Sequence, residues 1–276
     1  MHLNPLFLTN LFNNNCTEST VGSEWTLHQL APYIGKVKSS IAKFLIENFT
    51  EEGDIVFDPF CGAGTIPLEA WALGRHAIAN DLNKYAFVLT NAKLFPPPLA
   101  IDAIQQIEEF DKIVQKKSNK VDLKDVPIWV ANFFHPQTLK EIIIWMDILQ
   151  DRNSWFLLSC LLGILHHQRP GFLSFPSSHT VPYLRAKKFP PDEFPTLYQY
   201  RCVKERLLSK VKRALKRQPI FNTKLNRICY NQDASLLLPS ELVDAIITSP
   251  PYMRQLDYAI DNRLRLWFLG IGYWGL

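Results

Sequence analysis

The stretch Ile55-Val56-Phe57-Asp58-Pro59-Phe60-Cys61-Gly62-Ala63-Gly64-Thr65 decides the fold. Its first three residues are apolar and predict a short strand, the glycines predict a tight turn, and a helix is expected from about Thr65 to Leu73. Gly74 is well placed to end that helix. The sequence therefore places a glycine-rich turn between a strand and a helix.

The residues that follow repeat the pattern. His76 to Asn80 predicts a second strand that ends at Asp81, and Lys84 to Leu94 predicts a second helix. The run Pro96-Pro97-Pro98 terminates that helix. Strand, turn, helix and strand in this order predict a parallel, doubly wound α/β sheet.

The middle of the chain is expected to be mainly helical. Leu139 to Leu149 and Trp155 to Leu165 are strongly apolar, whereas the proline-rich Arg169 to Pro191 is expected to form a loop. A basic helix is expected from about Thr196 to Lys216. Strands then return, at Arg227 to Tyr230 before Asp233 and at Val243 to Thr248 before Ser249. A last helix would carry Arg263, Arg265 and Trp267, where packing is favoured over closing a site.

Composition excludes several classes of protein. Of 276 residues, 47% are hydrophobic and 20% are charged, as in a folded globular protein. No window approaches the roughly 18–20 apolar residues of a membrane span, and Met1 to Asn15 lacks the basic start of a signal peptide. Five cysteines without CxxC spacing indicate a reduced, cytoplasmic protein without a metal site. For His166, His167 and His179, polar contacts or loop structure are favoured over zinc.

Basic residues are concentrated in one segment. Residues 185 to 217 hold eleven Lys or Arg against three acids, so this stretch carries about +8 of a net charge of +4 for the whole chain. Such clustering favours a polyanionic partner, because each phosphate contact releases counterions. The alternative is a solvated helix face. The candidate contacts are Arg185, Lys187, Lys188, Lys204, Arg206, Lys210, Lys212 and Arg213.

The glycine-rich turn predicts a ligand site at the helix N-terminus. Asp58, at the strand end, suits the cationic half of a zwitterionic ligand better than a pyrophosphate. The full GxGxxG spacing of dinucleotide sites is also missing. Asp81, at the end of the next strand, is placed to bind ribose hydroxyls. A glycine turn without a ligand is the alternative.

The second motif is Thr248-Ser249-Pro250-Pro251-Tyr252, which follows an apolar strand. The two prolines make a stiff turn, so that neighbouring carbonyls stay available as acceptors. Ser249 adds a hydroxyl and Tyr252 a flat aromatic face, which together suit an amino group on a planar ring. An ordinary proline turn is the alternative.

Together the two motifs resemble those of the amino-group DNA methyltransferases, which make N6-methyladenine or N4-methylcytosine. Their catalytic tetrapeptide is [Asp/Asn/Ser]-Pro-Pro-[Tyr/Phe], and the serine form resembles the N4-cytosine branch. The resemblance implies a class I methyltransferase fold, S-adenosyl-L-methionine as cofactor, and double-stranded DNA with a flipped base as substrate. The implied catalytic residues are Ser249, Pro250, Pro251 and Tyr252. The implied cofactor-binding residues are Lys36, Asp58, Pro59, Phe60, Gly62, Gly64, Thr65, Asp81, Leu82, Asp233 and Ala234.

The same resemblance implies three segments. Residues 1–98 would form the cofactor-binding half, 99–219 a helical basic insertion that recognises the target, and 220–276 the catalytic half. In this family three more strands normally follow the catalytic motif. We therefore expect a sheet that lacks its C-terminal strands. Three explanations stay open: the sequence is a fragment, a second polypeptide completes the sheet, or the fold is abbreviated.

Two other functions remain open. Transfer RNA guanine-N2 methyltransferases have a very similar Asp-Pro-Phe-Cys-Gly-x-Gly-Thr motif, but they usually have Asp in place of Ser249 and carry an N-terminal RNA-binding domain. A chain that keeps only the basic helix would instead serve as a DNA-binding accessory subunit. Cofactor binding and the choice between DNA and RNA separate these readings.

Overall fold

The computed structural model describes residues 24–175, 185–237, 242–251 and 258–271, with the side chains at 185, 186, 258 and 259 left out. Expectations for Met1 to Asn15, His179 and Tyr252 fall outside these residues. The chain divides into two compact units. The sheet unit comprises Met1–His28, Gly35–Leu94 and Arg217–Met253, and the helical unit comprises Gln29–Ile34, Phe95–Lys216 and Arg254–Leu276. The boundaries predicted at 98/99 and 219/220 stay predictions.

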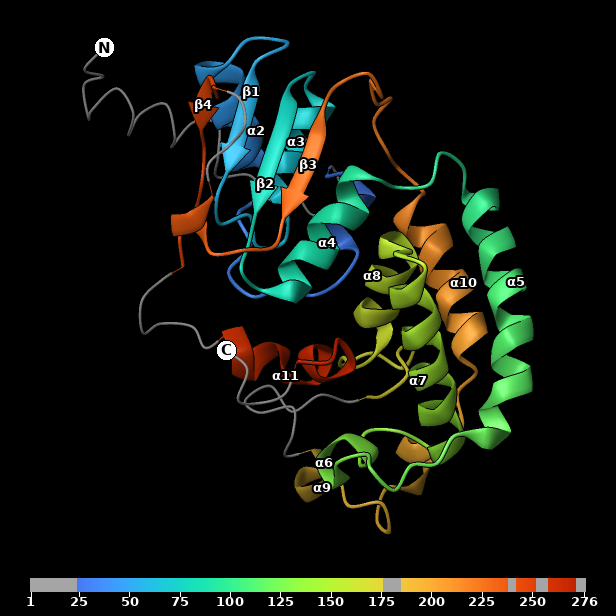
Figure 1. Ribbon diagram of the computed structural model, residues 1–276. Coiled ribbons are helices and arrows are strands. Elements are labelled where there is room, and N and C mark those ends of the chain that lie inside the picture. Colours follow the sequence, from blue (N-terminus) through green and yellow to red (C-terminus); the bar gives the residue numbers. More distant parts are fainter. Residues whose placement is uncertain (1–23, 176–184, 238–241, 252–257, 272–276) are drawn as a thin grey trace. The chain divides into compact units, whose positions relative to one another are not determined.

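Four parallel strands form the sheet, in the order β3-β2-β1-β4. They are β1 (Ile55–Asp58), β2 (His76–Asn80), β3 (Arg227–Tyr230) and β4 (Ala245–Ile246). The predicted parallel α/β sheet is thereby confirmed (Figure 1). The strand expected over Val243 to Thr248 is shorter than predicted. The side chains at its two ends turn back to β1 instead: the Asp244 carboxylate accepts from the Ile55 N–H, and the Thr248 hydroxyl donates to Asp58.

Helices cover one face of this sheet. They are η1 (Thr26–Gln29), α2 (Ser39–Phe49), α3 (Thr65–Ala72) and α4 (Lys84–Leu94), and η5 (Ala234–Leu236) follows β3. Gly74, with φ +84°, ends α3 as predicted. Small side chains let these helices approach the strands closely. The buried core consists of Ala42, Ile46, Val56, Ile66, Ala70, Ala77, Leu94 and Ile247.

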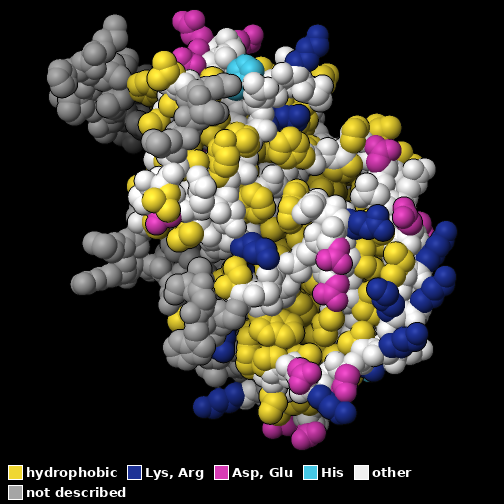
Figure 2. All heavy atoms as spheres, viewed as in Figure 1, with side chains coloured by type: hydrophobic (Ala, Val, Ile, Leu, Met, Phe, Trp, Pro, Cys, Tyr) yellow, Lys and Arg dark blue, Asp and Glu magenta, His cyan; other side chains and the backbone are white. Residues whose placement is uncertain are grey.

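The other sheet face carries a row of apolar side chains. The register aligns Ile246 with Phe57, Phe57 with Ile78, and Ile78 with Ile228, and aligned residues of parallel strands share a face. Ile246 is 62% exposed and Ile228 is 40% exposed. Figure 2 shows hydrophobic side chains gathered over these strands. Phe57 is 7% exposed and Ile78 is half-buried, so the row is open at its two ends. Since parallel sheets are normally covered on both faces, these ends suit a further covering element.

The helical unit is built around four helices that lie side by side (Figure 1): α5 (Ala100–Lys117), α7 (Pro136–Asp151), α8 (Trp155–Ile164) and α10 (Val203–Ala214). Smaller elements are η2 (Ser118–Lys120), α6 (Ile128–Ala131), α9 (Arg185–Lys188) and η4 (Pro195–Tyr198), and α11 (Tyr258–Phe268) ends the described part. Their core is large and aliphatic, with Trp145, Leu149, Leu158 and Leu207 almost fully buried. The helices expected at Leu139 and Trp155 are confirmed.

Two details of this unit differ from the sequence prediction. The basic helix begins at Val203 and not at Thr196, because Arg201 is held in an extended segment. Its backbone N–H donates to Thr138 Oγ1, and its guanidinium donates to the Leu197 carbonyl. The loop expected over Arg169 to Pro191 also contains the short helix α9. Within the described residues, no helix combines the length and the hydrophobicity that crossing a membrane requires.

Candidate functional site

The structure brings the two predicted motifs together at one edge of the sheet. Strands β1 and β4 are adjacent and parallel, so Asp58 and Thr248 both lie at carboxyl ends. Thr248 Oγ1 donates a hydrogen bond to Asp58 Oδ1 over 2.7 Å. Ser249 comes next and is half-buried, and Pro250 and Pro251 are exposed. In open α/β sheets, ligands bind outside the carboxyl ends of the strands.

Asp58 is held in an environment that disfavours its charge. Its residue surface is 2% exposed, and burial raises the pKa of its carboxyl to about 7, although hydrogen bonds from Thr248 and the Phe60 N–H oppose the shift and Asp81 adds to it. A nearby cation would lower the pKa of this carboxyl, because a positive charge stabilises the ionised form. Asp58 therefore has the chemistry expected of a residue that binds a cationic group.

Asp81 holds the glycine turn in place. Its Oδ2 accepts from the Gly62 N–H over 2.8 Å, and its Oδ1 accepts from the Asn83 N–H over 2.9 Å. Burial raises the pKa of Asp81, and these two backbone donors oppose the rise. Each carboxylate oxygen accepts more than one hydrogen bond. The expected contact with ribose hydroxyls thus stays a prediction, beside a structural role at the turn.

Gly64 and Thr65 begin α3 and differ in what they face. Gly64 has φ +69°, and a Cβ atom there would lie 2.6 Å from Thr90 Oγ1 and 2.9 Å from Thr90 Cα. Position 64 therefore requires glycine, because α4 approaches it closely. Thr65 is 4% exposed, and its Oγ1 has no hydrogen-bond partner in the structure. A buried hydroxyl without a partner at the first turn of a helix fits a polar ligand group at this position.

Two asparagines join the ends of β1, β2 and β3. Asn80 is fully buried, and its Nδ2 donates to the carbonyls of Pro59 and Gln232. Asn231 Nδ2 donates to the carbonyls of Asp81 and Leu82. Sequence reasoning did not single out Asn80, although a polar residue that ends an apolar strand is a readable signal. These bonds fix the loops that carry the expected cofactor residues.

The remaining expected cofactor residues lie on the surface of the sheet unit. Phe60 is 40% and Leu82 64% exposed. Asp233 is exposed and caps η5 by accepting from the Ser235 N–H, which together with the Ser235 hydroxyl lowers its pKa. Lys36 is exposed, and its Nζ donates to the His28 carbonyl over 3.1 Å. Their contacts with a cofactor stay predictions.

The basic residues of the helical unit divide into bound and exposed ones. Lys204 Nζ contacts Glu108 and Asp111, and Lys210 Nζ donates to the Gln29 carbonyl. Burial lowers the pKa of Lys210 to about 8. Arg206 is half-buried, and only the backbone of Arg185 is described. The exposed candidates are Lys187, Lys188, Lys212 and Arg213.

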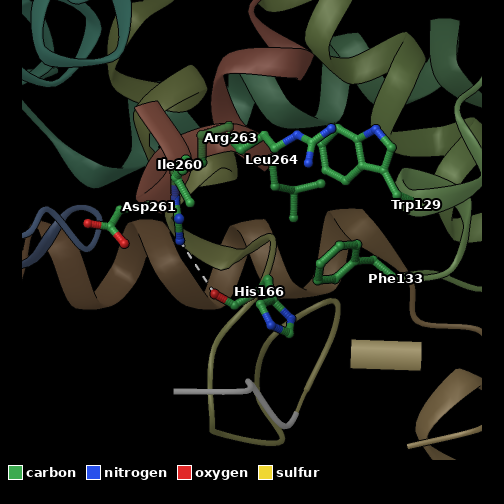
Figure 3. A pocket seen from close by; sticks show the side chains of 8 residues that line it. Trp129, Phe133, His166, Ile260, Asp261, Arg263 and Leu264 are labelled. Carbon is green, nitrogen blue, oxygen red and sulfur yellow. Dashed lines mark hydrogen bonds between the residues drawn. The ribbon is translucent and has the colours of Figure 1, made fainter. Parts of the chain in front are cut away.

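A small pocket lies inside the helical unit (Figure 3). Arg263 stacks over the Trp129 ring at 4.3 Å, and Arg265 donates to the His166 carbonyl over 3.4 Å. The pocket has a free volume of about 20 Å³, which accommodates a water molecule and not a nucleobase. His166 Nδ1 pairs with Ser174 Oγ, and His167 stacks on Phe172. Within the described ranges, no three His, Cys, Asp or Glu side chains gather as metal ligands would.

Comparisons with known proteins bear on this geometry. Residues 10–92 match the N6/N4 methyltransferase family, described as DNA methylase. The chain is 22% identical to the type II methyltransferase M.BsoBI of Geobacillus stearothermophilus, over 95% of this chain and 56% of that protein. The resemblance to the amino-group DNA methylases is therefore confirmed. A second DNA methylase relative, the type II methyltransferase M.MjaII of Methanocaldococcus jannaschii, is 25% identical over 31% of this chain and 17% of its own length.

These matches support the resemblance to this family and do not distinguish its branches. The chain spans a little over half of M.BsoBI and less than a fifth of M.MjaII. No solved structure was found to match it. The family match covers the glycine turn, α3 and most of α4, and ends before β3 and the Ser249 motif. The matched family model is described as DNA methylase, and the matches do not distinguish a target base.

Proposed function

We propose that this chain transfers a methyl group from S-adenosyl-L-methionine to the exocyclic amino group of a flipped base in double-stranded DNA, with cytosine N4 as the preferred target. The observation that carries the proposal is the 2.7 Å hydrogen bond from Thr248 Oγ1 to Asp58 Oδ1. It ties the start of the Ser-Pro-Pro turn to the carboxylate beside the glycine turn. The cofactor's methyl group and the amino group that receives it would thus meet at neighbouring strand ends. The order β3-β2-β1-β4 supports a class I methyltransferase sheet.

The fit of S-adenosyl-L-methionine rests on the side chains present. Asp58 would bind its ammonium group, and the unpartnered Thr65 hydroxyl would bind a polar group at the start of α3. Asp81 would bind the ribose and Asp233 with Ala234 the adenine. When bound, this cofactor supplies a methyl group on a positively charged sulfur that leaves as a neutral thioether.

The chain's own contribution to the reaction is to make the amino nitrogen a nucleophile. The amino lone pair of cytosine is delocalised into its ring. The Ser249 hydroxyl and the Pro250 carbonyl would accept hydrogen bonds from the two amino N–H groups and shift the nitrogen towards sp³ geometry. The nitrogen would form its bond to the methyl group as the bond from methyl to sulfur breaks, and would then lose one proton to solvent. Catalysis then comes from positioning and fixed dipoles, and no residue forms a covalent intermediate. Tyr252 would stack on the extruded base.

The direct test is methyl transfer from labelled S-adenosyl-L-methionine to mixed DNA and to transfer RNA, followed by nucleoside analysis. We expect N4-methylcytosine in DNA, and a loss of about 100-fold or more for Ser249→Ala. Ser154→Ala, at the residue that precedes α8 in the helical unit, is the matched control. N6-methyladenine would keep the enzyme class and change the base. Methylated guanine in RNA would replace this proposal with a transfer RNA methyltransferase.

An accessory subunit is the second candidate, and the exposed basic residues of the helical unit favour it. Such a subunit would bind DNA through Lys187, Lys188, Lys212 and Arg213 without needing a cofactor. Binding of S-adenosyl-L-methionine to the isolated chain, measured by calorimetry, separates the two. Cofactor binding supports the enzyme, whereas DNA binding without it supports the subunit.

We also propose that a second polypeptide covers the apolar row Ile246, Phe57, Ile78 and Ile228 and pairs with β4. The support is the exposure of Ile246 and Ile228, which lie at the two ends of this row. The isolated chain should then bind a hydrophobic dye, and the double variant Ile228→Thr/Ile246→Thr should bind much less. A chain whose dye binding is negligible, or the same in the variant, would contradict this proposal.

A further inference from the structure

A second group of buried ionisable residues lies in the sheet unit. His28 on η1, Glu69 on α3 and Lys93 on α4 are 2%, 4% and 2% exposed. His28 Nε2 and Glu69 Oε1 lie 2.6 Å apart. Charged side chains are seldom buried this deeply without a partner or a task. None of these three belongs to the motifs used by the proposed reaction.

The surroundings keep this group close to neutral. Burial lowers the pKa of His28 well below its usual value, and the charges of Lys93 and Lys36 lower it further. Burial also raises the pKa of Glu69 to about 7, and lowers that of Lys93 to about 7. A neutral imidazole has one donor and one acceptor nitrogen. His28 Nε2 is hydrogen-bonded to Glu69, and His28 Nδ1 has no hydrogen-bond partner among the described residues. One short hydrogen bond therefore holds the pair together.

The pair connects two parts of the expected cofactor site. Glu69 lies one turn beyond Thr65, on the helix that the glycine turn begins. His28 uses its backbone carbonyl to accept from Lys36 Nζ over 3.1 Å. A chain of contacts therefore runs from α3 through the His28 ring and backbone to Lys36. Lys36 is one of the residues that the family resemblance assigns to cofactor binding.

We propose that Glu69 and His28 are positioning residues, which hold Lys36 and the start of α3 in the arrangement that binds the cofactor. This inference rests on the proposed function. The two side chains do not touch the reacting atoms; they act through the His28 carbonyl and through α3. An ionised Glu69 accepts a charge-assisted hydrogen bond from the neutral ring, which is stronger than the bond made by the protonated acid.

The pair should therefore hold Lys36 more firmly above pH 7 than below it. The charged groups that face Glu69 are Lys43 and Glu47 on α2, Lys93 on α4 and Glu24. Those that face His28 are Lys93 and Lys36. In a Glu69→Gln variant the carboxyl no longer titrates, so its part of the pH dependence of cofactor affinity between pH 6 and 8 should disappear.

A double-mutant cycle on the full chain tests the inference. Binding of S-adenosyl-L-methionine is measured by calorimetry for wild type, Glu69→Gln, Lys36→Met and the double variant. Each single change should weaken binding about 10-fold, and the double change should cost little more than either, because both break one chain of contacts. Losses that multiply to about 100-fold overturn the inference. Glu109→Gln, at an exposed glutamate on α5 in the helical unit, is the control and should bind within about 2-fold of wild type.

Amide hydrogen exchange without cofactor provides an independent readout. In Glu69→Gln, exchange at residues 26–29 and 35–38 should rise while the amides of β1 and β2 keep their protection. A general rise through the sheet would show that Glu69 only supports the fold, and would overturn the inference. If wild type binds cofactor and Glu69→Gln binds equally well, the inference alone fails. If wild type binds none, the proposed function fails and this inference with it.

Discussion

The sheet unit and the helical unit bury their polar and charged side chains in different ways. In the helical unit, buried groups are tied to the backbone: Arg265 donates to the carbonyls of Leu162 and His166, and Glu141 accepts from the Val203 N–H. In the sheet unit, Asp58 and Glu69 are buried with pKa values raised to about 7. The contrast lies in the carboxyls, since Arg75 of the sheet unit also donates to the backbone and burial also lowers the pKa of Lys210 in the helical unit to about 8. The sheet unit keeps two buried carboxyls that change charge near neutral pH, as functional sites often do.

Asp58→Asn should have the largest effect, and it tests whether the sheet unit gives up stability for binding. The folded-state pKa of about 7 lies above the ordinary value of 3.8, so the stability contributed by the protonated carboxyl is full below pH 4 and is lost as pH rises to 7. The asparagine variant should therefore gain stability relative to wild type across that range, by up to about 4 kcal/mol. Denaturant unfolding at pH 4.5 and pH 8 measures this difference.

The same variant should lose cofactor affinity by about 100-fold, because the ammonium group loses its carboxylate. Wild-type affinity should rise between pH 6 and pH 8, as Asp58 becomes ionised. Calorimetry in buffers of different ionisation enthalpy would detect the proton released on binding. A variant that is less stable at pH 8, or that binds as well as wild type, would contradict the assignment.

Gly64→Ala should come next, and it contrasts a glycine of each unit. A Cβ atom at Gly64 would meet Thr90 within 3 Å, and φ is +69°, so the fold should lose about 2–4 kcal/mol. Gly171 in the helical unit has nothing within 4 Å of such an atom. Gly171→Ala is therefore the matched control and should change the unfolding free energy by less than about 0.5 kcal/mol. Equal effects in the two variants would remove the close approach of α4 as the explanation.

The third prediction concerns charge at the surface of the helical unit. Lys212→Glu/Arg213→Glu reverses two exposed charges on α10 and should weaken DNA binding about 10-fold to 100-fold, with a salt dependence lower by about two phosphate contacts. Cofactor affinity should stay unchanged. The measurement is binding to a fluorescent duplex at several salt concentrations. Unchanged DNA binding would favour the reading of α10 as a solvated face.

Lys204→Met should have the smallest effect. Lys204 lies on the same helix, but its Nζ contacts Glu108 at 2.7 Å and Asp111 at 3.3 Å. Because the Lys204 charge is already paired with these two carboxylates, DNA binding should change less than 2-fold. The unfolding free energy should fall by about 1 kcal/mol or less. Thermal unfolding and the duplex assay check both numbers. A large loss of DNA binding would return Lys204 to the contact surface.

Local patterns predicted the elements of the sheet unit well. Apolar runs followed by Asp58 and Asp81 marked β1 and β2, and Gly74 marked the end of α3. Partners far apart in sequence could not be read in this way. Thr248 meets Asp58 across 190 residues, and Lys204 meets Glu108 across 96. Five of the expected basic contacts lay on α10, yet no periodicity shows which of them a distant acid or carbonyl has already taken.

The pairing of β1 with a segment far along the chain has a consequence for folding during synthesis. The Ile55 N–H donates to Asp244, 189 residues further along the chain. β1 therefore cannot pair with β4 until the whole helical insertion has been synthesised. At bacterial or eukaryotic elongation rates of about 5–20 residues per second, that wait is about 10–40 s. The segment from Phe95 to Lys216 is continuous and rich in local contacts, so it has time to fold first on the ribosome. The edge of β1 that β4 later covers stays open during that interval, and an open strand edge can pair with another chain.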